Sequence, residues 1–320
     1  MYRGKRIALV IPAYNESRLI GPTLAATPEL VDRVIVVDDA STDDMGRVVR
    51  EHAERDARIE LVRHDTNRGP GAGIITGYKR VVADGFDVAV VVGGDNQMPL
   101  DQMTRLLDPI VDGRADYTKG NRFMRGGSLA MMPSDMPMTR VIGNMIITML
   151  TKVASGYYKV ADVVEGYTAI GRDALEQVDW DRAWPGYGYP MDFLIRLNAH
   201  GLRVLDVPRR AIYLPGERQS QIKGVRYALR VSPMLLRGFF WRLWTKNVLW
   251  DFHPLVFFYF FGMALLTGGT AYGGFLVWEQ IAGLGVSGPR AVLAALLIIT
   301  GLQFLLFGML FDMQEGDHRD

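Results

Sequence analysis

The segment DVAVVVGGDNQMP, residues 87–99, marks the sharpest change of character in the sequence. Its first half, residues 87–92, is an apolar, β-branched run that is typical of a strand buried on both faces of a parallel sheet. Its second half is polar and holds a single carboxylate, Asp95. These residues alone leave two interpretations open: a turn that contains an aspartate, or a ligand site at a strand end.

Three apolar runs of the same kind precede this segment and predict strands at 6–11, 33–37 and 59–62. Helical patterns at 18–26, 45–55 and 73–83 lie between the runs. Such alternation is characteristic of a doubly wound sheet with right-handed crossovers. The sequence therefore predicts the α/β fold class, with a sheet that is mainly parallel.

The predicted strand ends are polar and carry carboxylates. Strand one ends in PAYNE at 12–16, strand two in DDASTDD at 38–44 and strand four in GGDNQMP at 93–99. Ligands bind beyond the carboxyl ends of the strands in open sheets of this type. We therefore expect the three ends to share one ligand site.

Two loops also have plain structural explanations. A helix cap needs only one of Asp38 and Asp39, which leaves the other for a base or ribose. The glycines of NRGPGAG, residues 67–73, suit a simple turn and equally suit backbone brought close to a ligand. They do not form a phosphate-loop or dinucleotide fingerprint.

Beyond residue 122 the pattern is less regular. It predicts a helix at 139–155, a strand and turn in VVEGYTAIG, a helix at 192–199 and a strand in LRVLDVP. Gly201 is expected to cap the second helix. A buried arginine in KGNRF, residues 119–123, would require an anion as its partner.

Composition excludes several classes of function. Lys+Arg number 36 and Asp+Glu number 35, so no basic field indicates a nucleic-acid partner. The absence of cysteine excludes disulfides and thiolate metal sites. The N-terminal apolar run is short and interrupted by Pro12, so it predicts a strand rather than a signal peptide. The soluble part is expected to stay in the cytoplasm.

Two stretches without charged residues, 254–278 and 291–311, each reach the length of about 20 residues that crosses a bilayer. Buried core helices are the alternative. Lys and Arg are dense before the first stretch and scarce in the linker, which predicts a two-pass hairpin with the N-terminal part on the cytoplasmic side. The small residues Gly268, Gly269, Gly273 and Gly274 would let the spans pack against other copies in a homo-oligomer.

Residues 223–252 mix basic and large apolar side chains. They predict one or two amphipathic helices on the membrane surface, with a break at Pro233; a basic helix packed on the domain is the alternative. The apolar helix at 139–155 is open to two interpretations, a core helix or part of a groove for a lipid tail.

Six motifs occur in the order and spacing of glycosyltransferase family 2: VIPAYNE, VVDDASTD, GGDNQMP, GNRF followed by Gly126 and Gly127, DVVEGYTAI and DVP. Within this family the chain resembles the polyprenyl-phosphate glycosyltransferases, the relatives of dolichol-phosphate mannose synthase. The resemblance spans roughly residues 6–210. It implies a Rossmann-like glycosyltransferase A fold with a parallel-dominated sheet, followed by interfacial amphipathic helices and two transmembrane helices.

The implied organisation is a cytoplasmic catalytic domain at 1–222, juxtamembrane helices at 223–252, a transmembrane hairpin at 253–312 and a cytoplasmic tail at 313–320. The implied activity is the inverting transfer of one sugar from a UDP- or GDP-sugar to a polyprenyl phosphate. The resemblance assigns the donor to Pro12, Tyr14, Glu16, Asp39, Gly94, Asp95 and Gln97. It assigns the reaction centre to Asp95, Asp192 and Arg122. Arg122, Arg125 and Arg140 are candidates for the acceptor phosphate because arginine forks match phosphate oxygens, and Arg218 and Lys223 are candidates for the basic residues that bind phosphate in the family.

Members of the family hold Mg²⁺ or Mn²⁺ with two aspartates spaced by one residue. Here Gly93 stands at the first position, and only Asp95 remains. Mg²⁺ is usually bound by one or two carboxylates together with substrate phosphates and waters, so Asp95 is sufficient in principle. We expect the missing carboxylate to weaken metal binding in the absence of donor.

The acceptor implied by the resemblance needs no general base. A polyprenyl phosphate is largely dianionic at neutral pH, because its second ionisation lies near pH ~6 by analogy with phosphoserine. It can attack the anomeric carbon directly. We therefore predict that Asp192 positions or polarises a reacting group and is not an indispensable base.

Three other functions are alternatives to this one. A processive polysaccharide synthase usually carries a Q-x-x-R-W motif and more spans, and the motif is absent. A non-catalytic membrane scaffold that has kept the fold is favoured only by Gly93. A nucleotidyltransferase would need a Gly- and Lys-rich loop, which PAYNESR does not supply. The sequence does not name the sugar, the base or the lipid length.

Overall fold

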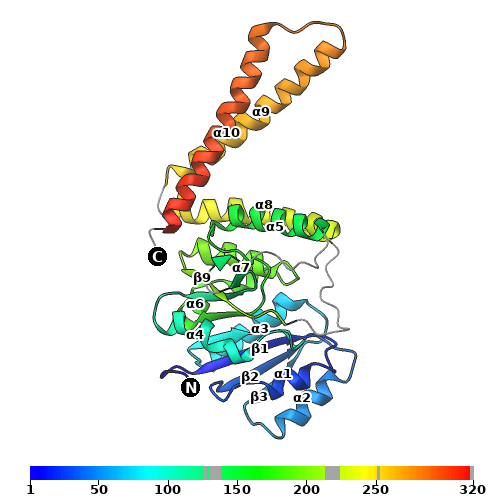
Figure 1. Ribbon diagram of the computed structural model, residues 1–320, viewed down its shortest axis with the longest axis vertical. Helices are drawn as coiled ribbons and strands as arrows, with labels where there is room; N and C mark the ends of the chain where they lie inside the picture. The colour runs from blue at the N-terminus through cyan, green and yellow to red at the C-terminus, as the bar shows by residue number, and fades with distance from the viewer. Residues whose placement is uncertain (126–127, 130–137, 213–223, 251–252, 318–320) are drawn as a thin grey trace. The chain divides into compact units, whose positions relative to one another are not determined.

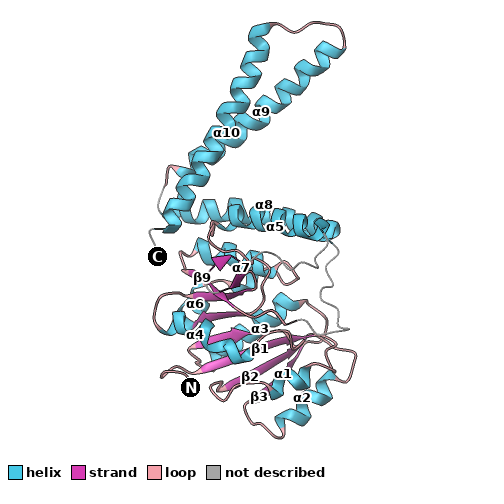
Figure 2. Cartoon of the chain, in the orientation of Figure 1, coloured by secondary structure: helices cyan, strands magenta, loops and turns pink. Residues whose placement is uncertain are grey.

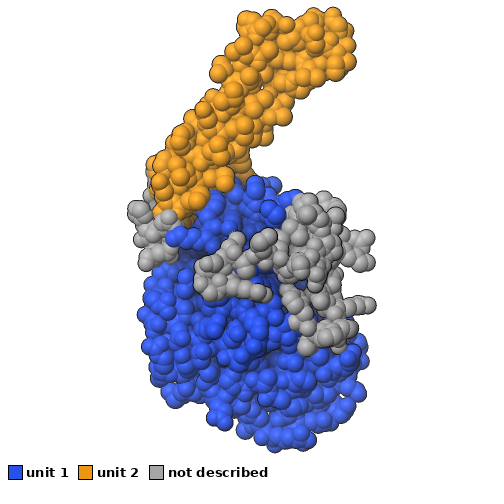
Figure 3. All heavy atoms as spheres, in the orientation of Figure 1, with its two compact units in different colours: residues 1–239 blue, residues 240–320 orange. Residues whose placement is uncertain are grey.

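The computed structural model describes residues 1–125, 128–129, 138–212, 224–250 and 253–317 (Figure 1). The chain divides into two compact units, residues 1–239 and 240–320 (Figure 3). This boundary falls inside a helix, 17 residues after the predicted limit of the catalytic domain at 222. The first unit holds every strand that the structure describes.

A seven-stranded sheet with the order β3-β2-β1-β4-β8-β5-β9 forms the centre of the first unit (Figure 2). Its strands are β1 (Ile7–Ala13), β2 (Arg33–Asp38), β3 (Ile59–Arg63), β4 (Val88–Val91), β5 (Tyr117–Asn121), β8 (Thr168–Gly171) and β9 (Val204–Pro208). Only β8 pairs antiparallel, with β4 and β5. A short ribbon of β6 (Met124–Arg125) and β7 (Ser128–Leu129) stands apart. The predicted α/β class and mainly parallel sheet are confirmed.

Helices cover both faces of this sheet. One face carries α1 (Ile20–Ala25), α2 (Met45–Ala53), η1 (Leu100–Gln102) and α4 (Met103–Val111). The other carries α3 (Pro70–Ala83), α6 (Arg172–Gln177), η2 (Trp180–Arg182) and α7 (Tyr189–Ala199). Along β1, Leu9 belongs to the first core and Val10 to the second, as the two-residue period of a strand requires. Burial on both faces explains why these strands read as unbroken apolar runs.

The predicted strands and helices of the first unit all occur, with shifted ends. Helix α3 begins at Pro70 rather than residue 73, because proline is favoured at the first helical position. Helix α7 begins at Tyr189, before the predicted start at Asp192. Gly201 follows α7 with a φ of 70°, which confirms the predicted glycine cap.

Two longer helices pack against α7. They are α5 (Met138–Ser155) and α8 (Gly224–Trp244), and Gly238 of α8 lies against Ile195. The predicted break at Pro233 is wrong, because α8 runs through it. Val231 and Met234, on either side of the proline, are buried, and this packing offsets the backbone hydrogen bond that a proline removes.

Helix α5 is not the fully buried core helix that was one interpretation of 139–155. Ile147 and Ala154 are buried, whereas Met145 is 58% and Met149 65% exposed. On α8, Leu236 is 59% exposed. Both helices thus bury one face and leave large apolar side chains on another, as helices at a membrane surface do.

The second unit contains the end of α8, the π-helical segment η3 (Thr245–Trp250), α9 (Leu255–Ile281) and α10 (Gly288–Asp317). Leu255–Ile281 and Gly288–Gln314 are long and apolar enough to cross a membrane. The two helices pack together, with Gly269 lying against Leu297 and Ile298. Among the described residues nothing lies within 4 Å of a Cβ built on Gly268 or Gly274, so these two glycines are open to packing with another copy.

Candidate active site

A cavity of about 900 Å³ opens in the first unit at the carboxyl ends of β1, β2 and β4. Its lining includes Pro12, Tyr14, Glu16, Asp39, Gly93, Gly94 and Asp95. The expected meeting of three polar strand ends is therefore observed. Residues 67–70, 184–188 and part of α8 complete the wall.

Each of the three strand ends holds a non-glycine residue with positive φ: Asn15, Ala40 and Asn96, at 58°, 62° and 52°. Side chains in this region of backbone space are strained, and such residues cluster at binding sites. Hydrogen bonds hold the first two loops together. The Asn15 N–H donates to Ser41 Oγ at 3.0 Å, and the Thr42 N–H donates to Asn15 Oδ1 at 2.8 Å.

Asp38 and Asp39 have different structural roles. Asp38 accepts the Ser41 N–H at 2.8 Å and pairs with Arg63 at 3.2 Å, which fixes the turn after β2. Asp39 lines the cavity. One carboxylate shapes the loop and its neighbour faces the ligand space, as the sequence suggested, although α2 starts only at Met45 and Asp38 does not cap it.

The Asp39 carboxylate is held from three sides. Its oxygens accept the backbone N–H groups of Arg68 at 2.9 Å and Gly69 at 2.7 Å. His64 Nδ1 lies 2.8 Å from the same carboxylate, and His64 Nε2 lies 2.9 Å from Thr76 Oγ1. Asp39 is 3% exposed, so its position is tightly determined.

Asp95 has far fewer partners. Among the described residues its carboxylate is recorded with one weak hydrogen bond, from the Gln97 N–H at 3.3 Å. Burial raises the pKa of Asp95, and the nearby Glu165 carboxylate raises it further, against the lowering effect of Arg209. A half-buried carboxylate with so little compensation is suited to a cation.

The residues at this strand end fit the divalent metal that the resemblance implies. Asp95 offers an oxygen donor at the cavity wall, the ligand type that Mg²⁺ and Mn²⁺ prefer. No cluster of three or more His, Asp or Glu that could hold a metal occurs within the described parts of the chain. Asp95 would therefore hold the ion together with donor phosphates and waters.

The glycines of residues 67–73 serve the packing of the protein. A Cβ on Gly69 would lie 2.7 Å from the Pro185 carbonyl oxygen, and one on Gly73 would lie 3.0 Å from Pro12 Cβ. Gly69 also has a φ of 95°. The loop thus brings α3 against β1 and against residues 184–188, while Asn67–Pro70 still reach the cavity.

Asp192 lies outside the described cavity lining and hydrogen-bonds to a residue of the cavity wall. Its Oδ2 accepts the Trp184 N–H and the Arg196 Nε–H, both at 2.8 Å. It is buried, and it is absent from the described lining of the cavity. Because Trp184 itself lines the cavity, Asp192 positions the wall formed by residues 184–188.

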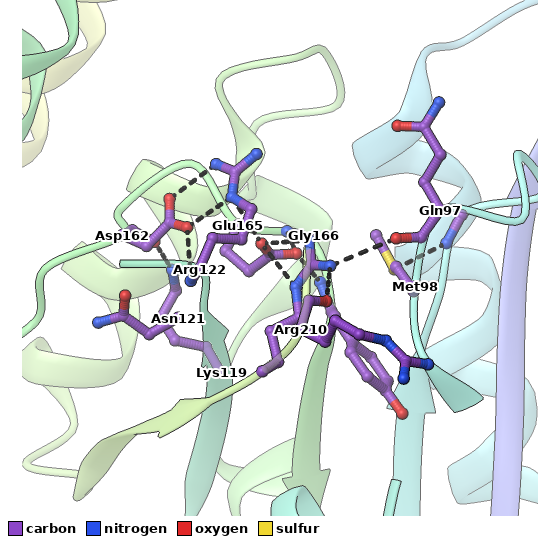
Figure 4. A network of polar contacts seen from close by, with 12 residues as sticks. Gln97, Met98, Lys119, Asn121, Arg122, Asp162, Glu165, Gly166 and Arg210 are labelled. Atoms are coloured by element: carbon purple, nitrogen blue, oxygen red, sulfur yellow. Dashed lines mark hydrogen bonds and ion pairs between the residues drawn. The ribbon is translucent and has the colours of Figure 1, made fainter. Parts of the chain in front are cut away.

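Arg122, whose side chain is half-buried, pairs with buried carboxylates in a network of ion pairs (Figure 4). Its guanidinium meets Asp162 at 2.7 and 2.9 Å and Glu165 at 3.1 Å. The anion expected for a buried arginine in KGNRF is thus a pair of protein carboxylates. Burial alone would raise the pKa of Asp162, but hydrogen bonds and charge from Arg122 and the charge of Lys119 lower it.

Glu165 connects this network to the Asp95 loop. Arg209 donates to Glu165 Oε2 at 2.7 and 3.1 Å and to the Gln97 carbonyl at 3.3 Å. Figure 4 shows the Gln97 side chain pointing away from the network. Lys119 is completely buried and donates to the Asp162 carbonyl, and burial lowers its pKa.

The structure thus brings together most of the predicted donor residues but not all predicted catalytic ones. Gln97, Arg122 and Asp192 are absent from the described cavity lining. Arg125 lies in β6 and Arg140 in α5, while Arg218 and Lys223 fall outside the described residues.

Sequence reasoning missed the roles of His64, Asp162, Glu165 and Arg209. The sequence did contain a signal for Asp162, Glu165 and Arg209. DVVEGYTAI holds two carboxylates in an otherwise apolar stretch, and two arginines follow the DVP strand directly. Charges in such positions predict mutual pairing, since isolated charges are costly to bury.

Comparison with known proteins identifies relatives of this site. Residues 8–179 match the family model described as glycosyl transferase family 2. A UDP-N-acetylglucosamine–dolichyl-phosphate N-acetylglucosaminyltransferase of Methanococcus voltae is 28% identical over 65% of this chain and 86% of its own. An undecaprenyl-phosphate mannosyltransferase of Micrococcus luteus is 29% identical over 63% of this chain and 82% of its own.

Among solved structures, glucosyl-3-phosphoglycerate synthase from Mycobacterium tuberculosis, in complex with Mn²⁺ and UDP-glucose, is similar in fold. The TM-score is 0.51 at 21% identity, covering 75% of this chain and 79% of that one. This likeness supports the glycosyltransferase A fold that the sequence motifs implied.

Proposed function

The chain belongs to glycosyl transferase family 2, and from that premise we propose that it moves one sugar, with inversion, from a UDP- or GDP-sugar to a polyprenyl phosphate. The observation that carries the proposal is the cavity in which Asp39 and Asp95 meet at the carboxyl ends of β2 and β4. The names of the Methanococcus and Micrococcus relatives, with their dolichyl- and undecaprenyl-phosphate acceptors, support the same class of acceptor.

The two carboxylates suit the two ends of a nucleotide-sugar. Asp39 is a fixed hydrogen-bond acceptor for a nucleoside donor group. Asp95 would hold Mg²⁺ or Mn²⁺, and the ion when bound would offset negative charge on the departing diphosphate. The Asn15–Ser41 hydrogen bond ties the loops after β1 and β2 together, and the Thr23 hydroxyl of α1 donates to the Gly94 carbonyl next to Asp95.

The acceptor phosphate supplies its own nucleophile. As a dianion it attacks the anomeric carbon from the side opposite the diphosphate, the bond to the diphosphate breaks, and no proton has to be removed. Consistent with this chemistry, the carboxylate of Asp192 is already engaged by Trp184 and Arg196. Its part in the reaction is to hold the cavity wall.

A membrane location accounts for the apolar surfaces. The exposed methionines of α5, the exposed Leu236 of α8 and the two apolar helices suit a protein that meets a lipid acceptor at the bilayer. We propose a two-pass arrangement with the catalytic domain on the cytoplasmic side. Cysteine substitutions in the 282–287 linker and in the first unit, tested for labelling from either side of sealed vesicles, would test that topology.

The activity is tested by a panel of radiolabelled donors incubated with membranes that contain the protein, with and without Mg²⁺ or Mn²⁺. The expected product is an organic-extractable, mild-acid-labile glycolipid formed from one donor. Transfer into a water-soluble polymer would instead indicate a polysaccharide synthase. Failure of every donor to bind, with or without metal, would indicate a non-catalytic scaffold.

A further inference from the structure

His64 makes two side-chain contacts that the proposed reaction does not use directly. Its Nδ1 lies 2.8 Å from Asp39 Oδ1 and its Nε2 lies 2.9 Å from Thr76 Oγ1. The residue follows β3, Asp39 follows β2, and Thr76 lies on α3. The ring therefore connects three elements at the edge of the cavity.

The chemistry of the neighbours determines what each ring nitrogen does. An ionised carboxylate only accepts hydrogen bonds, so His64 Nδ1 must carry a proton and donate it to Asp39. The Thr76 hydroxyl can donate to Nε2 of a neutral ring or accept from a protonated one. In either case Thr76 holds the ring in the plane that keeps Nδ1–H directed at Asp39.

The carboxylate of Asp39 then has little acceptor capacity left. A carboxylate offers about four lone-pair sites, and His64, Arg68 and Gly69 occupy three of them. The Arg68 and Gly69 donors come from a loop backbone, whereas the His64 donor is a side chain braced by a helix. Loss of this third donor would leave the carboxylate held only by the two backbone N–H groups of one loop, one on each oxygen, and would remove the one side-chain restraint on its orientation.

We propose that His64, braced by Thr76, is a positioning residue that fixes the orientation of the Asp39 carboxylate and thereby selects the nucleobase of the donor. The inference rests on the proposed function. A carboxylate held in one orientation favours the base whose N–H meets its free lone pair and disfavours bases that present an acceptor there. A less firmly held carboxylate would adjust to several bases and bind each of them less well.

Two substitutions of His64 test the contacts of Nδ1 and Nε2 separately. The side-chain amide of asparagine reaches about as far as Nδ1, so His64→Asn keeps the donor to Asp39. The amide of glutamine reaches about as far as Nε2, so His64→Gln keeps the contact with Thr76 and loses the donor. Glutamine fills the space of histidine better, so a purely structural role would favour His64→Gln.

The test uses the full-length protein in detergent and measures the Kd of UDP, GDP, CDP and ADP in the presence of Mg²⁺. For the nucleotide that the wild type prefers, we expect His64→Gln to raise Kd about tenfold, equivalent to about 1.4 kcal/mol, and to reduce the preference over the other three. His64→Asn should stay within about threefold of wild type. With the matching sugar donor, KM should follow Kd while kcat at saturation is kept.

Thr76 provides a second test if position 64 does not tolerate change. Thr76→Val should weaken nucleotide selectivity and Thr76→Ser should keep it. Equal binding and selectivity in wild type and His64→Gln, or equal losses in His64→Asn and His64→Gln, would overturn the inference while leaving the proposed function intact. A wild type that binds none of the four nucleotides would overturn the proposed function, and the inference with it.

Discussion

Glu165, which is buried, and Asp95, which is half-buried, are nearby carboxylates in very different surroundings. Glu165 accepts hydrogen bonds from the Gly166 and Tyr167 N–H groups and pairs with Arg209 and Arg122. Within the described residues, the Asp95 carboxylate accepts one weak hydrogen bond, from the Gln97 N–H. The protein thus satisfies the hydrogen-bonding capacity of Glu165, whereas Asp95 keeps oxygen lone pairs for the proposed metal ion.

The comparison distinguishes carboxylates that pair within the protein from carboxylates that we propose to bind the donor. Asp162 and Asp192 resemble Glu165, because arginines and backbone N–H groups engage them. Asp39 is also held by three donors, but like Asp95 it lines the cavity, whereas Asp162, Glu165 and Asp192 are absent from the described lining. We therefore expect loss of a cavity-lining carboxylate to affect turnover, and loss of a paired carboxylate outside the lining to affect stability or the shape of the cavity.

The largest effect is expected at Asp95. We predict that Asp95→Asn lowers kcat/KM by more than about 100-fold, because electrostatic stabilisation of the departing diphosphate is lost. The melting temperature should change little or rise, since a poorly compensated, half-buried carboxylate is removed. Sugar-transfer assays and thermal melting check both parts. Asp101→Asn, which removes an exposed carboxylate on the following turn, is the control. Near-normal turnover in Asp95→Asn would rule out the single-carboxylate metal site.

For Glu165→Gln we predict the opposite of Asp95→Asn: a large loss of stability. The change leaves the buried Arg209 without its charged partner, and breaking a buried ion pair costs about 3–5 kcal/mol. A lowered unfolding midpoint in denaturant would show this loss. Glu176→Gln, in the exposed pair with Arg172, should have little effect. A stable but inactive Glu165→Gln would place Glu165 among the functional carboxylates and remove the contrast with Asp95.

The pH dependence of stability in Arg122→Gln tests whether Arg122 has a structural role. The folded-state pKa of Asp162 is depressed, so its contribution to stability is present above the unfolded pKa and is lost as pH falls through the folded pKa. In Arg122→Gln the lowering effects of Arg122 are lost while burial and the Lys119 charge remain, so the pKa of Asp162 should rise relative to the wild type and acid destabilisation should begin at a higher pH. Melting temperatures between pH 7 and pH 3 measure the shift. Unchanged acid stability with lost donor binding would instead make Arg122 a phosphate ligand, as the family resemblance implied.

Asp192→Asn should have a moderate effect. Asparagine can still accept the Trp184 N–H but pairs less strongly with Arg196, so the cavity wall is weakened and not removed. We expect turnover within about tenfold of wild type, a raised donor KM and an unchanged shape of the pH–rate profile. Complete loss of turnover with intact donor binding would show that Asp192 is a base.

The sequence predicted what depends on local pattern. Apolar runs located β1 to β4, and the rule for parallel sheets brought Asp39 and Asp95 to one edge. The pairing of Arg122 with Asp162, 40 residues away, and of Arg209 with Glu165, 44 residues away, depends on side-chain directions that no local pattern contains. The same is true of His64, which follows β3 and whose two side-chain partners follow β2 and lie on α3.

Gly93→Asp carries the smallest expected effect and examines the Asp95 side of the comparison most directly. A Cβ at this position would lie 3.0 Å from Asp95 Oδ1, the end of a side chain that can move by a few tenths of an ångström. Without metal the two carboxylates repel each other, and with metal both can bind it. We therefore expect turnover within about threefold of wild type and a lower metal concentration for half-maximal activity. Gly93→Asn, which adds similar bulk without charge, should show no gain. Equal metal requirements in the two variants would mean that residue 93 lies out of reach of the ion.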